Sequence, residues 1–308
     1  MKASRAAMAK TLTALITGAV VLLATVGCGG NASGRGGVPG TLRVGLIPNI
    51  SPEKQKAQYE PFRKHLAQKL GVKVELLVAT DYAGVVEALV AKRVDIAYLG
   101  GLTYVQAAEQ TPITPLVTEV DADTGTPKYL SAIVVRKDAP YRTVKDLVAA
   151  GGRVAFGDVS STSGSLYPRI MLVAAGAHCD KSDLAKCPPL RSVVFTGGHD
   201  AAAAAVLRGN VDAAGLELRI LHRLERQDTV PAGALRVIET RAVMGYPWVA
   251  RDGLSDQARR TIVGAFTSIT DPQLLALMRA KKYVTVTAAD YSTIRQQAAA
   301  LGLLTTTG

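Results

Sequence analysis

Three adjacent hydroxyl residues, Ser161, Thr162 and Ser163, lie between a predicted strand and a predicted helix. At a helix N-terminus the free backbone N–H groups point outward and the helix dipole favours an anion. The hydroxyls add hydrogen-bond donors there without adding charge. A role as a helix cap explains one of these hydroxyls but not all three. The segment therefore predicts a site for a tetrahedral oxyanion, with an ordinary cap in a solvated loop as the alternative.

His199 lies in a similar place, between a strand and an Ala-rich helix. We expect it at the carboxyl edge of a sheet, where it can donate a hydrogen bond to the same anion. A structural or exposed histidine is the alternative. The four histidines have no spacing typical of metal ligands, so we expect neither a metal nor a cofactor.

The elements that position these residues alternate between strand and helix patterns. The first half predicts strands at 41–47, 72–79 and 94–98, with helices that begin at Ser51, Asp81 and Gly100. This order is typical of a parallel α/β sheet. Two further strands are predicted at 113–120 and 129–136, and the second leads into another domain.

A second α/β unit follows. It is predicted to contain a helix at 143–150, a strand at 153–156, a helix after Ser163, a strand at 192–195, a helix at 199–207 and a strand at 211–216. After 236–238 the pattern changes. A returning strand is predicted at 246–250 and helices at 255–268, 272–281 and 288–300, and we expect these helices to pack on the first domain. Two such sheets leave a cleft at their carboxyl edges, where ligands bind.

The N-terminus has the pattern of an export signal. Basic residues near Met1 precede an uncharged run at 11–27 that ends at Cys28, which predicts a signal peptide over 1–27. We expect Cys28 to be lipidated and residues 28–40 to form a flexible tether. Thr25 stands where lipoprotein sites usually carry a larger aliphatic residue. A transmembrane anchor is the alternative, although the run is short for a span.

The charge and the cysteines indicate the kind of ligand and the compartment of the protein. The net charge is +11, and the basic residues are scattered instead of clustered. This distribution, without a groove-reading motif, favours an anionic ligand over nucleic acid. Cys179 and Cys187 predict one local disulfide in an exported protein, with two free thiols as the alternative.

The sequence also resembles the phosphonate- and phosphite-binding proteins of ABC importers, the PhnD type. The segments that carry the resemblance are Asp81-Tyr82, 94–100, Ser161-Thr162-Ser163-Gly164 with Pro168, Gly198-His199-Asp200, and 209–214. The resemblance implies a type II periplasmic-binding fold with two α/β lobes that close by hinge motion. We place lobe 1 at 41–125 with 241–308, and lobe 2 at 126–240.

By position, the resemblance implies that Ser161, Thr162, Ser163 and His199 grip the phosphorus oxygens from lobe 2. Tyr82 and Tyr104 match aromatic positions that close the pocket from lobe 1, with ordinary packing beneath a helix as the alternative.

Two further positions concern the substituent of the ligand. Glu217 matches an acidic position near it and can accept a hydrogen bond from a protonated oxygen or an amine. Aminophosphonate binders carry a second carboxylate before Pro247, where this chain has Tyr246. A desolvated ammonium needs a compensating charge. We therefore expect phosphite or a small phosphonate without an amine, and phosphate stays open.

The predicted function is capture of this ligand by a monomer on the outer face of the cell membrane and delivery to an ABC permease, without catalysis. Two alternatives stay open. One is a binding protein for a different ligand, such as a sulfonate, nitrate or pyrimidine precursor. The other is an exported phosphoesterase with Ser161 or Ser163 as nucleophile, which requires an activating base or metal.

Overall fold

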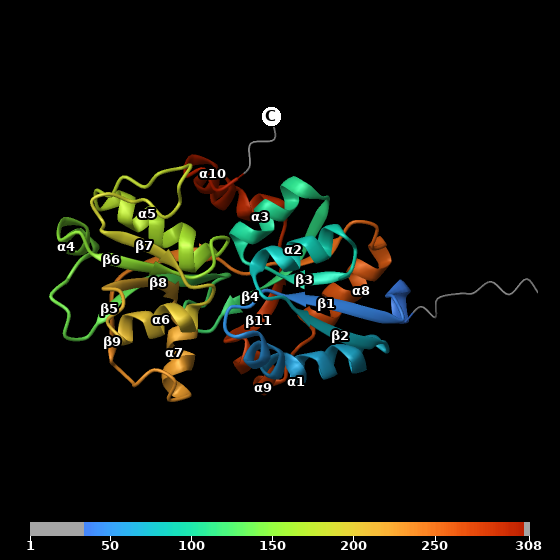
Figure 1. The fold of residues 1–308 in the computed structure, drawn as a ribbon. Helices are drawn as coiled ribbons and strands as arrows, with labels where there is room; N and C mark the ends of the chain where they lie inside the picture. The colour runs from blue at the N-terminus through green and yellow to red at the C-terminus, as the bar shows by residue number, and fades with distance from the viewer. Residues whose placement is uncertain (1–33, 305–308) are drawn as a thin grey trace, which may run out of the picture. The chain divides into compact units, whose positions relative to one another are not determined.

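The computed structural model describes residues 34–304. Two β-sheets, each flanked by helices, make up this part of the chain (Figure 1). The six-stranded sheet has the order β11-β4-β10-β3-β1-β2, and the five-stranded sheet has the order β7-β6-β8-β5-β9. We refer to the six-stranded sheet with its helices as lobe 1 and to the five-stranded sheet with its helices as lobe 2. The predicted two-sheet α/β architecture is confirmed.

Lobe 1 is built from two separate stretches of chain. Its strands are β1 (Thr41–Leu46), β2 (Lys73–Val78), β3 (Ile96–Tyr98), β4 (Ile113–Asp121), β10 (Trp248–Arg251) and β11 (Ala280–Thr285). Its helices are η1 (Arg35–Gly37), α1 (Pro52–Leu70), α2 (Tyr82–Val90), α3 (Gly101–Gln110), α8 (Asp256–Thr267), α9 (Pro272–Leu277), η3 (Ala288–Tyr291) and α10 (Ser292–Ala300). Strand β1 is parallel to β2 and β3, as predicted, whereas β10 and β11 are antiparallel to their neighbours.

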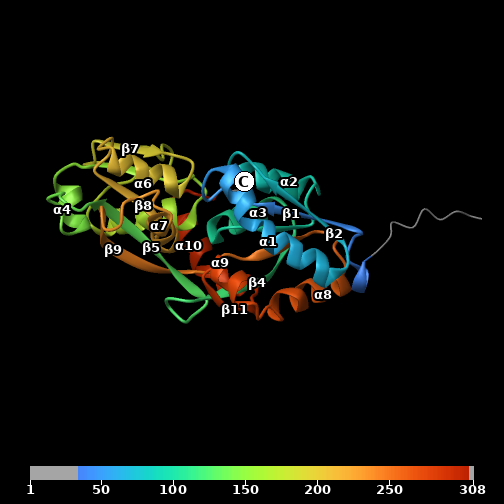
Figure 2. The same ribbon diagram turned by 90° about the horizontal axis from the view of Figure 1, so that it is seen from below.

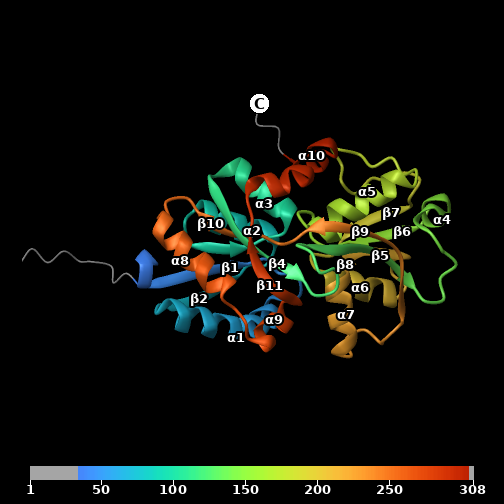
Figure 3. The same ribbon diagram turned by 180° about the vertical axis from the view of Figure 1, so that it is seen from behind.

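Helices cover both faces of the lobe 1 sheet. α2 and α3 lie on one face and α1 and α9 on the other (Figures 1 and 3). An aromatic cluster joins the sheet to α1 and α8, because Trp248 packs against Phe62 and Phe266 with ring centroids 5.4 and 4.8 Å apart. None of the helices described within 34–304 combines the length and apolar character needed to cross a membrane.

Lobe 2 is one continuous stretch. Its strands are β5 (Lys128–Arg136), β6 (Arg153–Phe156), β7 (Ser192–Phe195), β8 (Ala213–Glu217) and β9 (Leu235–Met244). Its helices are α4 (Val144–Ala149), η2 (Thr162–Leu166), α5 (Tyr167–Ala174), α6 (His199–Leu207) and α7 (Leu218–Arg226). α4 and α5 pack on one face of this sheet and α6 and α7 on the other, each over its own apolar cluster (Figure 1).

The chain passes between the two sheets twice. It enters lobe 2 between β4 and β5 and returns to lobe 1 between β9 and β10. Figure 2 shows the paired strands β5 and β9 running side by side toward lobe 1. Both passages are therefore short backbone segments next to the same pair of strands.

Three elements differ from the predictions. Strand β9 runs over Leu235–Met244, where the sequence indicated only a change of pattern after 236–238. The helix predicted at 272–281 ends at Leu277, and the chain then forms strand β11 antiparallel to β4. Arg279, with a φ of 48°, makes the turn between them. Helix α7, directly after β8, was not predicted.

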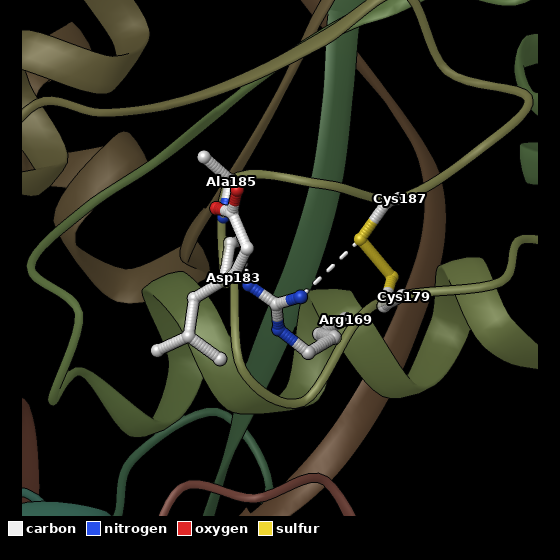
Figure 4. The surroundings of a disulfide bond; sticks show 6 residues. Arg169, Cys179, Asp183, Ala185 and Cys187 are labelled. Carbon is white, nitrogen blue, oxygen red and sulfur yellow. Dashed lines mark hydrogen bonds between the residues drawn. A yellow bond between two sulfur atoms is a disulfide. The ribbon is translucent and has the colours of Figure 1, made fainter.

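The predicted disulfide joins Cys179 to Cys187. Figure 4 shows the Arg169 side chain of α5 reaching into the loop that this bond closes. The fully buried guanidinium donates hydrogen bonds to the Leu184 carbonyl at 2.6 Å and to Cys187 Sγ at 3.2 Å. Burial lowers the pKa of Arg169 to about 10. The disulfide loop is thus fastened to the helix that continues from η2.

Replacing both cysteines by serine should lower the free energy of unfolding by about 2–3 kcal/mol. The crosslink closes a loop of only nine residues, 179–187, and a loop of this size is worth about that much in the chain-entropy model. Chemical unfolding monitored by circular dichroism measures the loss. The unaltered protein under reducing conditions is the control and should lose the same amount. An unchanged midpoint in the double variant would show that the bond does not contribute.

Candidate ligand-binding cleft between the two lobes

The hydroxyl segment follows β6 and forms one turn of π-helix, η2, at the start of α5. Gly157 N–H donates to Gly164 O at 2.9 Å, and Ser160 N–H donates to Asp158 Oδ1 at 2.7 Å. These two bonds hold the loop before the helix in a tight bend. Single π-turns inside helices occur often at functional sites. The predicted strand and helix around this segment are confirmed.

The three predicted hydroxyls have three different environments. Ser161 Oγ caps η2 by accepting a hydrogen bond from Gly164 N–H at 3.0 Å. Thr162 Oγ1 accepts one from Leu102 N–H of α3, in lobe 1, at 2.9 Å. Ser163 Oγ is buried and has no hydrogen-bond partner among the described residues. Ser161 and Thr162 use their oxygens as acceptors and keep their own O–H groups as donors, whereas Ser163 Oγ makes no hydrogen bond of either kind in the described residues.

His199 is the first residue of α6 and is completely buried. Its Nδ1 accepts a hydrogen bond from Glu217 N–H at 3.2 Å, so the ring proton is on Nε2. Nε2 has no hydrogen-bond partner within 34–304. Burial lowers the pKa of His199 to about 4, although the Glu217 charge acts in the opposite direction. The imidazole is therefore a neutral donor at physiological pH.

The imidazole lies directly against the π-turn. A Cβ atom at Gly164 would come within 2.9 Å of His199 Cε1 and 2.8 Å of Ser161 Oγ. Only a residue without a side chain allows this close approach. Glycine at this position thus brings the hydroxyl segment and His199 together, as the sequence analysis predicted for the two sheet edges.

Glu217 ends β8 and is almost fully buried. Its Oε2 accepts a hydrogen bond from Tyr246 OH at 2.6 Å, and its Oε1 accepts one from Arg219 Nε at 2.5 Å. Burial by itself would raise the pKa of Glu217, but the positive charge of Arg219 and the hydrogen bonds outweigh it, and the pKa is lowered. The structure therefore brings Glu217 and Tyr246 together, with an ionised carboxylate that accepts a hydrogen bond from a neutral phenol.

Asn49 links the two lobes, and the sequence analysis did not identify it. It follows β1, and its Oδ1 accepts a hydrogen bond from Tyr82 OH at 2.6 Å, with Tyr246 OH 3.4 Å away. Its backbone carbonyl accepts one from His199 N–H at 3.0 Å. Its place shortly after the first strand of a parallel sheet could have identified it, because ligands bind at the carboxyl ends of such strands. Tyr82 is thereby connected to the other predicted residues through Asn49.

Tyr129 of β5 is a second residue that the sequence analysis missed. Its ring centroid lies 5.1 Å from that of Tyr246. Its hydroxyl is buried without a hydrogen-bond partner in the described part of the chain. Burial and the Glu217 charge raise the pKa of Tyr129, so its hydroxyl is protonated and can donate a hydrogen bond.

Tyr104 is placed differently from the other predicted residues. It lies on α3 in the lobe 1 core, and its ring packs edge-on against Tyr291 with centroids 5.0 Å apart. Within residues 34–304 no side-chain hydrogen bond connects it to Ser163, His199 or Glu217. The structure therefore does not bring Tyr104 into this cluster.

Further hydrogen bonds close the lobes over the cluster. Tyr82 N–H donates to Asp158 Oδ2 at 3.2 Å, and Thr103 Oγ1 donates to Ser160 O at 3.0 Å. With the Thr162 and His199 contacts, these bonds hold lobe 1 directly against the η2 and α6 N-termini. The structure is that of a closed cleft.

A small cavity adjoins Glu217 within the closed cleft. Its volume is about 30 Å³. It is lined by Asn49 and Tyr98 from lobe 1 and by Glu217, Arg219 and Arg223 from lobe 2, among others. Such a cavity holds roughly two waters or a small substituent. Nowhere in 34–304 do three or more His, Cys, Asp or Glu side chains assemble in a way that could hold a metal ion.

Residues 44–291 match the family described as ABC transporter, phosphonate, periplasmic substrate-binding protein. The chain belongs to this family. It is 34% identical over 225 residues to the phosphate-import protein PhnD of Mycolicibacterium smegmatis, a match that covers 72% of this chain and 69% of that protein. It is 32% identical over 228 residues to the phosphonates-binding periplasmic protein of Escherichia coli, a match that covers 73% of this chain and 65% of that protein.

A solved structure agrees with the family assignment. PhnD1 from Prochlorococcus marinus, in complex with methylphosphonate, superposes with a TM-score of 0.74 at 25% identity and covers 86% of this chain and 99% of that one. The predicted type II periplasmic-binding fold and the resemblance to the PhnD type are confirmed. The family consists of substrate-binding components of transporters.

Proposed function

We propose that this chain captures phosphite or a small phosphonate between its lobes and delivers it to an ABC permease. The main support is the group of buried donors on lobe 2, Ser163 Oγ, His199 Nε2 and Tyr129 OH, which lack protein partners in the described structure. A buried polar atom without a partner costs about 1–3 kcal/mol. A small oxyanion would satisfy all three at once.

The electrostatics of these donors also suit an anion. Hydroxyls and a neutral imidazole donate hydrogen bonds without requiring a buried counter-charge, and the N-termini of η2 and α6 add favourable dipoles. In this proposal Ser161 and Thr162, whose oxygens accept backbone N–H groups, keep their own O–H groups to donate to the ligand beside Ser163, and Tyr82 closes the pocket through Asn49. Glu217 and Tyr246 stand at the substituent side of the ligand.

Binding without catalysis agrees with the state of the hydroxyls. A nucleophilic serine needs an adjacent base, and Ser163 Oγ is not hydrogen-bonded to any base within 34–304. His199 Nδ1 is occupied by the Glu217 N–H, and Nε2 carries the proton. We therefore favour transport over a phosphoesterase.

We further propose hinges at the β4–β5 and β9–β10 passages, with lobe 1 at 41–125 and the chain after β9, and lobe 2 from residue 126 to the end of β9. The boundary predicted at 240/241 falls inside β9 (Leu235–Met244). Residues 1–33 lie outside the described part of the chain, and the signal peptide, the lipid at Cys28 and a tether over 28–33 are proposals that rest on sequence. Residues 34–40 of the predicted tether pack on lobe 1 instead, where Val38 is buried and η1 contacts α8. A lipid anchor would keep a monomeric binding protein at the outer face of the membrane, beside its permease.

Calorimetric titration of the purified protein with phosphite, methylphosphonate, phosphate and sulfate tests the ligand class. We expect phosphite or methylphosphonate to bind at least about 100-fold more tightly than sulfate and phosphate, since a pocket can reject an extra oxygen that finds neither room nor a donor. Tightest binding of phosphate would instead assign the protein to phosphate import. The absence of detectable binding with every phosphorus compound would refute the ligand assignment.

A further inference from the structure

Arg219, the second residue of α7, places a buried positive charge at the substituent side of the cleft. Its side chain is 9% exposed. The guanidinium lies 4.7 Å from the centroid of the Tyr129 ring and 5.8 Å from that of Tyr246. Besides the bond to Glu217, its Nη1 lies 3.4 Å from Asp121 Oδ2. Aromatic and acidic groups therefore fix the cation in one position.

Arg219 already compensates the charge of Glu217. One carboxylate oxygen receives the Arg219 Nε–H bond, and the other receives the Tyr246 hydroxyl. A ligand ammonium that approached Glu217 would therefore share the carboxylate with a fixed guanidinium and lie close to that like charge.

The cavity beside Glu217 is also lined by positively charged side chains. Three guanidiniums line it, those of Arg219, Arg223 and Arg279, and Glu217 is the single carboxylate among its described lining residues. Asp121 and Asp123, behind this lining, pair with Arg219 and Arg279. Two like charges about 5 Å apart repel by roughly 3 kcal/mol at an effective dielectric constant of 20. An ammonium in this cavity would therefore be strongly disfavoured.

We infer that Arg219 is a specificity-determining residue that excludes phosphorus ligands with an ammonium-bearing substituent. The inference rests on the proposed function and deepens it, because it names the substituent that the site rejects. Arg219 neutralises Glu217 and converts it from a receptor for an amine into an anchor for Tyr246. The site then takes ligands whose substituent is absent, or small and uncharged.

The test compares two ligands of equal size, 2-aminoethylphosphonate and propylphosphonate, so that charge is separated from bulk. We expect the unaltered protein to bind the amine at least about 100-fold more weakly than its hydrocarbon counterpart. Arg219→Met keeps much of the side-chain volume but removes the charge. It should reduce the ratio of the two dissociation constants, amine over hydrocarbon, by at least about 10-fold. Competition against methylphosphonate measures both ligands on one scale.

Arg226→Met is the matched control, because Arg226 is on the same helix, carries the same charge and does not line the cavity. It should leave the ratio unchanged. Arg219→Gln, which removes the charge and keeps a donor for Glu217, should narrow the ratio as well and serves if Arg219→Met does not fold.

The outcomes separate the two proposals. A ratio near one in the unaltered protein, or an unchanged ratio in both Arg219 variants, would overturn the role of Arg219 and leave the phosphorus assignment intact. If the unaltered protein binds methylphosphonate but neither larger ligand, size sets the limit and the role of Arg219 is overturned. If no phosphorus compound binds, the proposed function fails and the inference fails with it.

Discussion

A variant that combines Ser163→Ala with His199→Asn should bind phosphite about 1,000-fold more weakly than the unaltered protein. Each side chain offers one buried donor without a protein partner in the described structure. A hydrogen bond to a charged group is worth about 1.5–3 kcal/mol, so the loss of two amounts to roughly 4 kcal/mol. Calorimetry on the double variant and on both single variants measures the loss and its additivity.

The same variant should keep most of its stability. Ser163 Oγ makes no hydrogen bond within 34–304, and Asn at position 199 can still accept from Glu217 N–H through its side-chain oxygen. Ser165→Ala is the matched control. Two residues along a π-turn reverse the side-chain direction, so Ser165 should not face the ligand and its removal should leave affinity unchanged. Affinity within about threefold of the unaltered value in the double variant would exclude both donors from the site.

Acid should destabilise the protein through His199. The unfolded chain takes up a proton on this residue near pH 6.5, whereas the folded protein, with a pKa of about 4, does not. Between these values the unfolded state binds more protons, so stability is lost as the pH falls from about 7 toward 4. The contribution is about 3 kcal/mol. Chemical unfolding at a series of pH values measures it.

His199→Asn isolates this contribution from that of the carboxylates. Glu217 also has a lowered pKa, so its protonation in acid destabilises the fold in the same direction. The asparagine cannot titrate, and its variant should therefore lose less stability between pH 7 and 4, by about the His199 contribution. Parallel pH profiles of the two proteins would show that the imidazole is not buried in its neutral form.

The parts of the site that follow a strand and begin a helix could be predicted from sequence. Local patterns define β6, β7 and α6, and the observed strands at 153–156 and 192–195 and the helix at 199–207 coincide with the predicted ones. Which of the predicted hydrogen-bond donors lacks a protein partner could not be predicted, because the partners come from distant parts of the sequence. Glu217 N–H, for example, selects the tautomer of His199, so that Nε2 carries the proton.

The remaining differences have similar causes. The Ala and Lys residues around 281 favour a helix, but pairing with β4, distant in sequence, makes this segment a strand. Helix α7 follows β8 without a turn residue, although Ile220, Leu221 and Leu224 have helical spacing. Because α7 was missed, the sequence analysis did not place Arg219 beside Glu217. Tyr129 resembles any other residue of a buried strand, and only its unpartnered hydroxyl distinguishes it.

The most direct test of the proposed function is a crystal structure of the protein with phosphite bound. We predict the phosphorus atom between η2 and the N-terminus of α6, with ligand oxygens about 3 Å from Ser163 Oγ and His199 Nε2. A ligand bound elsewhere, or bound in the cleft while His199 Nε2 donates to a protein atom, would contradict the account of the site.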